Sequence, residues 1–173
     1  MRRFFAIFAL LGLLCLPACS GEAVKPKEEE PKVPLTFETD LRVSVKTLQI
    51  TAHYRQEMLG HGTITVTQPE SINGLVIRFE GSKCQIQFKG LTLSPDLSKI
   101  PESAFAGVLM DALSKQLEGV EIQREKQDGK WRFTGNAAAG DFVLVQDAES
   151  GNYESLTVPA LELTILFQNF TQF

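Results

Sequence analysis

Hydrophobic and polar residues alternate along most of the chain after about residue 35. Apolar side chains at every second position are typical of strands that bury one face. The alternation changes parity at Lys46-Thr47, and turn residues interrupt it at Gly60–Gly62, Glu80–Ser82 and Asp128-Gly129. Pro69 is expected to end the third strand. The pattern predicts about ten strands, at 37–45, 48–54, 64–66, 75–80, 84–88, 120–122, 131–133, 142–145, 156–158 and 161–167.

One segment departs from this two-residue period. Leu91–Ile100 contains Pro95 and is expected to be a loop. From Pro101 the apolar residues recur at helical spacing, and Gly119 stands just past the last of them. These apolar residues are Phe105, Val108, Leu109, Ala112, Leu113 and Leu117. One face of the predicted helix is therefore apolar and must cover another element.

The order of these elements favours a mainly β, α+β fold. Short connections between strands indicate an antiparallel meander, and a flat sheet of about ten strands would curl. We therefore expect a strongly curved antiparallel sheet or unclosed β-barrel, with the single central amphipathic helix as a lid. An ordinary antiparallel sheet packed on one helix is the alternative, and the two differ in whether a cavity remains between helix and sheet.

The start of the chain has a different pattern. Two arginines precede an apolar run from Phe4 to Leu16, and small residues lead to Cys19, which predicts a secretory leader over residues 1–18. The run is shorter than the roughly 20 residues that span a bilayer. Leu16–Cys19 resembles the cleavage site of bacterial lipoproteins, which implies that the sulfur of Cys19 carries a diacylglycerol and attaches the protein to a membrane.

Residues 19–34 are rich in charge and proline and contain few apolar side chains. Such a segment buries too little surface to offset its ordering entropy, so we expect a lipidated, disordered tether followed by one domain over 35–173. The expected location is the extracytoplasmic face of the cell membrane, or the outer membrane in a Gram-negative source.

Charge and cysteine content indicate which binding partners and which disulfides are expected. Loss of the two leader arginines moves the formal net charge from −4 to −6, and no basic stripe is visible, so nucleic acid is not an expected partner. Cys15 leaves with the leader and Cys19 is acylated, so Cys84 has no cysteine to pair with. Cys84 alternates with Ile86 and is expected to face the interior.

Sequence signals for catalysis are weak. His53 and His61 have no metal ligand at a characteristic spacing, and no nucleophile, phosphate-binding or dinucleotide motif is present. Asp147 and Glu149 precede Gly151 and are explained by a turn. We therefore expect no enzyme activity, no metal and no cofactor.

Several short stretches together resemble the LolA/LolB-like proteins of the lipoprotein-carrier superfamily, in particular small lipoproteins of that fold from clostridia. These stretches are Gln68–Glu70, Ile72–Leu75, Phe88–Leu91, Asp147–Gly151 and Phe167–Phe170. They are turn and strand residues, so the resemblance concerns the fold more than an activity. It implies an unclosed antiparallel barrel with an apolar interior that holds acyl chains.

The resemblance implies a function and a set of binding residues. The chain is expected to bind a lipid, a lipoprotein or another acylated partner in an apolar cavity beneath the helix. The candidate wall and lid residues are Phe79, Ile86, Phe88, Phe105, Val108, Leu109, Leu113, Trp131, Phe133 and Phe167. The alternative is a non-enzymatic interaction or structural module of the cell or spore envelope, approached closely at Ala104, Ala106 and Gly107 of the helix.

Overall fold

The structure is a computed structural model, and it describes residues 30–95, 104–119, 122–137 and 139–173. One unit, Pro31–Phe173, contains the folded part of the chain. The expected leader over 1–18, the lipid attachment site Cys19 and the tether as far as residue 29 lie outside the described residues.

Eleven strands and one α-helix make up the described part of this unit. The strands are β1 (Phe37–Val45), β2 (Leu48–Met58), β3 (His61–Gln68), β4 (Val76–Glu80), β5 (Lys83–Phe88), β6 (Leu91–Leu93), β7 (Ile122–Gln127), β8 (Lys130–Ala137), β9 (Gly140–Asp147), β10 (Tyr153–Val158) and β11 (Leu163–Gln172). The helix α1 spans Phe105–Glu118, and the short 3-10 helices η1 and η3 span Glu70–Ile72 and Pro159–Leu161.

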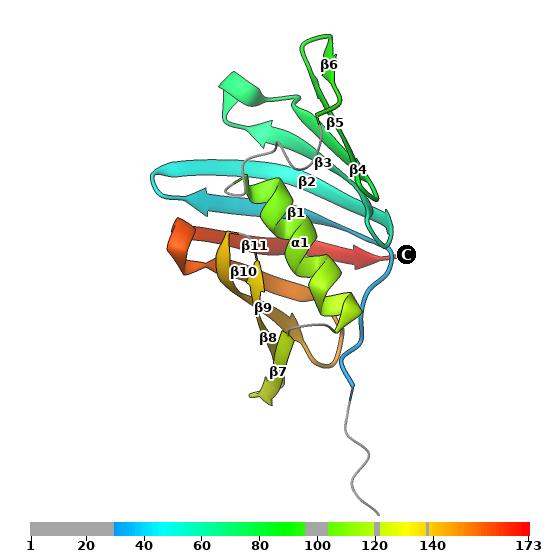
Figure 1. The fold of residues 1–173 in the computed structure, drawn as a ribbon, viewed down its shortest axis with the longest axis vertical. Coiled ribbons are helices and arrows are strands. Elements are labelled where there is room, and N and C mark those ends of the chain that lie inside the picture. The colour runs from blue at the N-terminus through cyan, green and yellow to red at the C-terminus, as the bar shows by residue number, and fades with distance from the viewer. Residues whose placement is uncertain (1–29, 96–103, 120–121, 138) are drawn as a thin grey trace, which may run out of the picture. The chain divides into compact units, whose positions relative to one another are not determined.

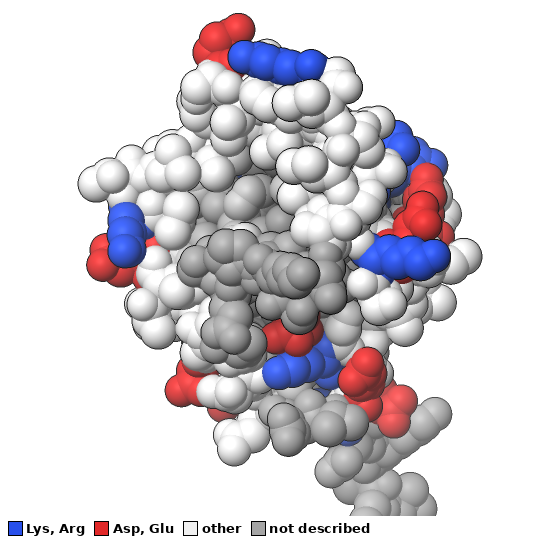
Figure 2. All heavy atoms as spheres, turned by 45° about the horizontal axis from the view of Figure 1, so that its top comes forward, with Lys and Arg blue, Asp and Glu red and all other residues white. Residues whose placement is uncertain are grey.

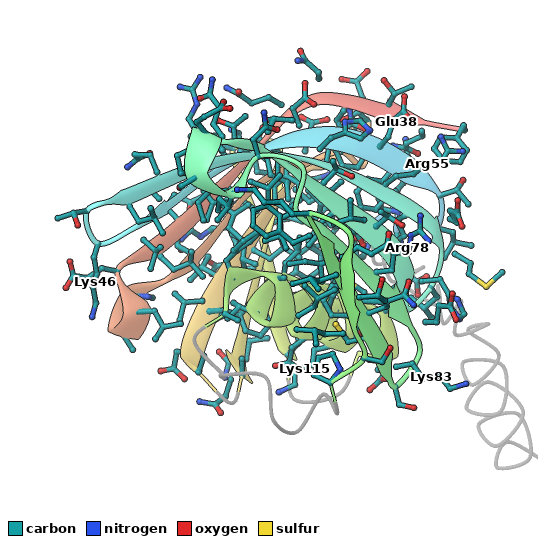
Figure 3. The ribbon with its side chains drawn as sticks, turned by 90° about the horizontal axis from the view of Figure 1, so that it is seen from above. Glu38, Lys46, Arg55, Arg78, Lys83 and Lys115 are labelled. Carbon is teal, nitrogen blue, oxygen red and sulfur yellow. The ribbon has the colours of Figure 1, made fainter. Side chains whose placement is uncertain are left out.

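The strands form one antiparallel sheet in the order β6-β5-β4-β3-β2-β1-β11-β10-β9-β8-β7. The first and last strands pair in the middle of the sheet, whereas β6 and β7 form its two edges (Figure 1). The helix α1 lies between β6 and β7 in the chain and so connects these two edges. The predicted curved and unclosed antiparallel sheet is confirmed, with α1 lying on its concave face (Figures 1 and 3).

The strand β6 was not expected, because Leu91–Ile100 contains Pro95 and was interpreted as a loop. Lys89 and Gly90 both have positive φ, 48° and 83°, as a two-residue hairpin turn between right-twisted strands requires. This turn brings Leu91 opposite Phe88 and extends the sheet by one short strand. The prediction of about ten strands was therefore one strand short.

The strand expected over 120–122 overlaps β7 at Ile122, and β7 continues beyond the expected end. β7 begins at Ile122 and ends at Gln127, while residues 120 and 121 lie outside the described residues. Every β7 residue after Ile122 is exposed, because β7 is an edge strand. An edge strand that is exposed on both faces lacks the alternation of apolar and polar residues on which strand prediction depends.

The core lies between the concave face of the sheet and α1. Six helix residues are buried against the sheet: Ala106, Val108, Leu109, Ala112, Leu113 and Gln116. The helix ends as predicted, because Gly119 adopts a left-handed conformation with φ 63° and its N–H bonds to the carbonyl of Lys115. The predicted apolar helix face is therefore confirmed: Val108, Leu109, Ala112 and Leu113 are buried, and Phe105 and Leu117 are half-buried.

The antiparallel strands place the turns at two ends of the sheet. The end that we call the terminal end contains Phe173, the start of β1 and the β2–β3, β4–β5 and β9–β10 turns. The far end contains the β1–β2, β5–β6 and β10–β11 turns. In Figure 3, Lys46 marks the far end, and Arg55 and Lys83 lie toward the terminal end.

The residues just before β1 are held at the terminal end. The amide nitrogen Nε2 of Gln146 donates hydrogen bonds to the carbonyls of Lys32 and Gly151, and Nε2 of Gln56 donates to the carbonyl of Leu35 at 3.0 Å. The folded unit accordingly begins at Pro31, four residues before the boundary expected at residue 35.

Candidate functional site

Most of the predicted cavity residues lie in the core. Seven of them are buried and belong to one apolar cluster: Phe79, Val108, Leu109, Leu113, Trp131, Phe133 and Phe167. Ile86 and Phe105 are half-buried and pack against this cluster, and Phe88 is also half-buried. The structure therefore brings the seven residues together, but as side chains of the core formed by sheet and helix.

The apolar face of the sheet becomes exposed to solvent toward β6. Ile77, Ile86 and Leu93 lie opposite one another on β4, β5 and β6, so their side chains share the core face. Exposure rises across the row from 9% at Ile77 to 64% at Leu93. Leu91, opposite Phe88, is 71% exposed. We call Ile86, Phe88, Leu91 and Leu93 the apolar edge.

The apolar edge contains two predicted residues, Ile86 and Phe88, and two that sequence reasoning missed, Leu91 and Leu93. The available signal was the Leu-Thr-Leu alternation after Lys89-Gly90. An apolar side chain that is left exposed beside a buried core is a feature of binding surfaces when several such side chains adjoin. The apolar edge is the candidate functional site.

Two buried tyrosines fix α1 on the sheet. The hydroxyl of Tyr54 in β2 lies 3.5 Å from the sulfur of Met110, and the hydroxyl of Tyr153 in β10 donates to Oε1 of Gln116 at 2.5 Å. Burial raises the pKa of both phenols, so both remain protonated donors. Phe37 packs edge-on against each ring, at centroid distances of 5.5 and 5.6 Å.

Two buried amide atoms near these contacts have no hydrogen-bond partner in the described part of the chain. Among the described residues, Nε2 of Gln116 donates no hydrogen bond and Oε1 of Gln146 accepts none. A buried amide atom without a partner destabilises the folded state, so the bond from Tyr153 partly offsets burial of the Gln116 side chain.

The titratable side chains His53, Asp40 and Cys84 have structural roles. Nδ1 of His53 lies 3.1 Å from Asp40 on the solvent face, and hydrogen bonds from Asn169 and His53 lower the pKa of Asp40. Burial raises the pKa of the Cys84 thiol, which reduces its nucleophilicity. No group of three His, Cys, Asp or Glu side chains is placed to hold a metal within the described ranges.

The turn expected at Asp147–Gly151 is confirmed. Oδ1 of Asp147 accepts hydrogen bonds from the backbone N–H of Ser150 at 2.7 Å and of Glu149 at 3.2 Å. These bonds, with that from the Ser150 hydroxyl, lower the pKa of Asp147. The acidic residues therefore shape the β9–β10 connection.

The surface offers a polar pocket as well. It has a volume of about 400 Å³ and adjoins the β4–β5 hairpin; its lining residues are Arg78, Glu80, Ser82, Lys83, Cys84, Gln85, Ser94 and Pro95. Charges of both signs line it. Figure 2 shows basic and acidic side chains interspersed around the margin of the face in view, with no extended patch of one sign there.

The part of the chain that the structure describes contains no helix of the length and apolar character needed to cross a bilayer.

The fold is thus an unclosed antiparallel sheet curved around the helix that joins its edges. No protein-family model matches the chain, and no curated protein matches it by sequence. Among solved structures, it is similar to an uncharacterized conserved protein from Thermus thermophilus, with a TM-score of 0.55, 6% identity and coverage of 82% of this chain and 80% of that chain. This likeness supports the fold alone.

Other similar structures have lower scores. A LolA superfamily protein from Nitrosomonas europaea has a TM-score of 0.41 and 6% identity, over 84% of this chain and 88% of that chain. A chain in the structure of the CwlD amidase from Clostridioides difficile in complex with the GerS lipoprotein has a TM-score of 0.48 and 12% identity, over 82% of this chain and 84% of that chain. Because both TM-scores are below 0.5, neither similarity supports a conclusion about this chain.

Proposed function

We propose that the chain is a lipoprotein, anchored through Cys19 at the extracytoplasmic face of a membrane, that binds an acyl chain of a lipid or of a lipidated partner along the apolar edge. The exposure of Leu91 and Leu93 beside the buried core carries this proposal. Burying one leucine side chain contributes about 1.5–3 kcal/mol, so an acyl chain laid against both residues gains a useful driving force.

In this proposal α1 limits how far the acyl chain enters. Leu109 and Leu113 already cover the centre of the concave face, while Phe105 at the start of the helix is half-buried. The ligand therefore extends the core at its open side, and α1 acts as a lid over the remainder. The motif resemblance to LolA/LolB-like proteins points to the same class of ligand.

The edge position of β6 supports a second candidate function, recognition of an envelope protein. An edge strand presents backbone N–H and C=O groups that can pair with a strand of another protein. The close approach expected at Ala104, Ala106 and Gly107 receives less support, because Ala106 is buried in the core and is not available to a partner.

One crosslinking experiment separates the two functions. A photoreactive amino acid replaces Leu93 in the full chain expressed in bacteria, and adducts are extracted and identified by mass spectrometry. Leu166 is the matched control position, because it is exposed on the opposite face of β11. A lipid or acylated adduct at 93 and not at 166 supports acyl binding. A non-acylated protein adduct supports the second candidate, and equal adducts at both positions contradict both.

A further inference from the structure

A second group of exposed apolar side chains lies at the terminal end. The described residues contain eight large apolar side chains that are exposed, and four belong to this group, with exposures from 47% to 57%. We call the group the apolar rim; its members are Leu35, Met58, Leu59 and Phe173. The remaining four lie elsewhere on the sheet, and two of them belong to the apolar edge.

Backbone pairing brings the rim residues together from three parts of the chain. Phe37 pairs with Gln56, so Leu35, two residues before Phe37, and Met58, two residues after Gln56, both lie just beyond this pairing at the terminal end. The N–H of Phe173 bonds to the carbonyl of Thr36 at 3.4 Å, which joins the last residue to the same place. The rim is therefore a product of strand register and is held by the main chain.

The ion pairs beside the rim contain more negative than positive charge. The guanidinium of Arg55 lies 4.6 Å from the ring centroid of Phe173 and pairs with Glu38 at 3.2 Å and with Glu57 at 3.7 Å. One arginine against two carboxylates gives no excess of positive charge. A surface of this composition suits an uncharged apolar boundary better than an anionic ligand, because apolar burial requires no counter-charge.

The position of the rim residues in the chain indicates what the rim contacts. The folded unit begins at Pro31, only four residues before Leu35, and Cys19 precedes Pro31 by twelve residues. Twelve residues span at most about 40 Å when fully extended. If Cys19 is acylated as proposed, the bilayer lies within this reach of Pro31, and Lys32 is held at the same terminal end of the sheet as the rim, so a lipid surface is present at that end at high effective concentration.

We propose that the apolar rim rests in the interface of the membrane to which the chain is anchored. This inference rests on the proposed acylation of Cys19. Interfacial contact of this kind buries apolar side chains by about 5–10 Å at the boundary of headgroups and acyl chains. Because Leu91 follows the β5–β6 turn, it then lies at the end of the sheet away from that membrane.

Depth-dependent quenching tests this orientation. The full acylated chain is reconstituted in phosphatidylcholine vesicles, with and without bromine on the acyl chains, as two variants, Phe173→Trp and Leu91→Trp. Both positions are exposed, and the native Trp131 is buried and common to both variants. We expect bromine to quench the Phe173→Trp variant about twofold more than the Leu91→Trp variant, since only the rim reaches the acyl boundary.

A further substitution separates insertion from simple proximity. Met58→Glu, added to the Phe173→Trp variant, places a charge in the rim and is expected to abolish the extra quenching while the protein still floats with the vesicles. Equal quenching of the two tryptophan variants in floating protein, or stronger quenching at position 91, overturns the orientation alone. A chain that does not float with vesicles overturns the proposed anchoring and the orientation together.

Discussion

The hydrogen bond between Tyr153 and Gln116 makes a sharp prediction about how α1 is held on the sheet. Both side chains are buried, and their oxygens are 2.5 Å apart. Tyr153→Phe removes the hydroxyl but keeps the ring, so the apolar contacts of the ring with Phe37 and Phe167 remain. The change leaves the Gln116 amide without any hydrogen-bond partner among the described residues.

The expected loss in free energy of unfolding is about 1–3 kcal/mol, the usual effect of leaving a buried polar group unsatisfied. Gln116→Leu alone removes the unpartnered Nε2 but leaves the Tyr153 hydroxyl without its acceptor. The double variant contains neither the hydroxyl nor the amide. It is expected to lie within about 1 kcal/mol of the unmodified protein, because replacing both partners by apolar groups is nearly neutral.

Urea unfolding followed by Trp131 fluorescence measures these free energies, since Trp131 is the single tryptophan and is buried. Amide hydrogen exchange in α1 shows whether the loss is local to the helix. The reasoning is refuted if Tyr153→Phe lowers the free energy of unfolding by less than about 0.5 kcal/mol, or if the double variant loses the full sum of the two single variants.

Two further predictions concern packing and charge. Gly62→Ala places a Cβ 2.7 Å from Cε2 of the buried Tyr54, so it should lower the free energy of unfolding by about 1–3 kcal/mol. At Gly107 in α1 a Cβ meets no atom of the described residues within 4 Å, so Gly107→Ala should not lower the free energy of unfolding, whether urea or heat is used. Equal changes in the free energy of unfolding for the two variants would contradict the close approach of Gly62 to Tyr54. In an NMR titration, Asp40 should show a pKa below 3.8 that rises in Asn169→Ala. A pKa unmoved by that change would contradict the assigned cause.

The direction of the Asp40 effect on stability follows from linkage. The folded-state pKa of Asp40 lies below the unfolded value, so the folded protein binds this proton less readily than the unfolded chain. The contribution of Asp40 to stability is therefore present above a pH of about 3.9 and is lost as the pH falls through the folded-state pKa. Solvent reaches both Asp40 and His53, so screening keeps this contribution small.

The amino-acid sequence by itself determined the elements whose signals are local. Alternation identified strands that bury one face, and the turn residues at Lys46-Thr47 and Asp128-Gly129 located hairpins that the structure contains. Helical spacing and the Gly119 cap identified α1 and its end. The extent of β7 was missed because an edge strand that is exposed on both faces need not alternate. β6 was missed because Leu91–Ile100 contains Pro95 and was interpreted as a loop, although Leu91-Thr92-Leu93 alternates.

Only the tertiary structure decided which apolar residues remain exposed. Phe133 and Phe88 have the same alternating pattern in the sequence, yet Phe133 lies beneath α1 and Phe88 lies toward an edge that the helix does not cover. The apolar rim likewise depends on register, because Leu35, Met58 and Phe173 come from distant parts of the chain. Sequence patterns report which side of a strand is apolar, whereas burial depends on what the rest of the chain places against that side.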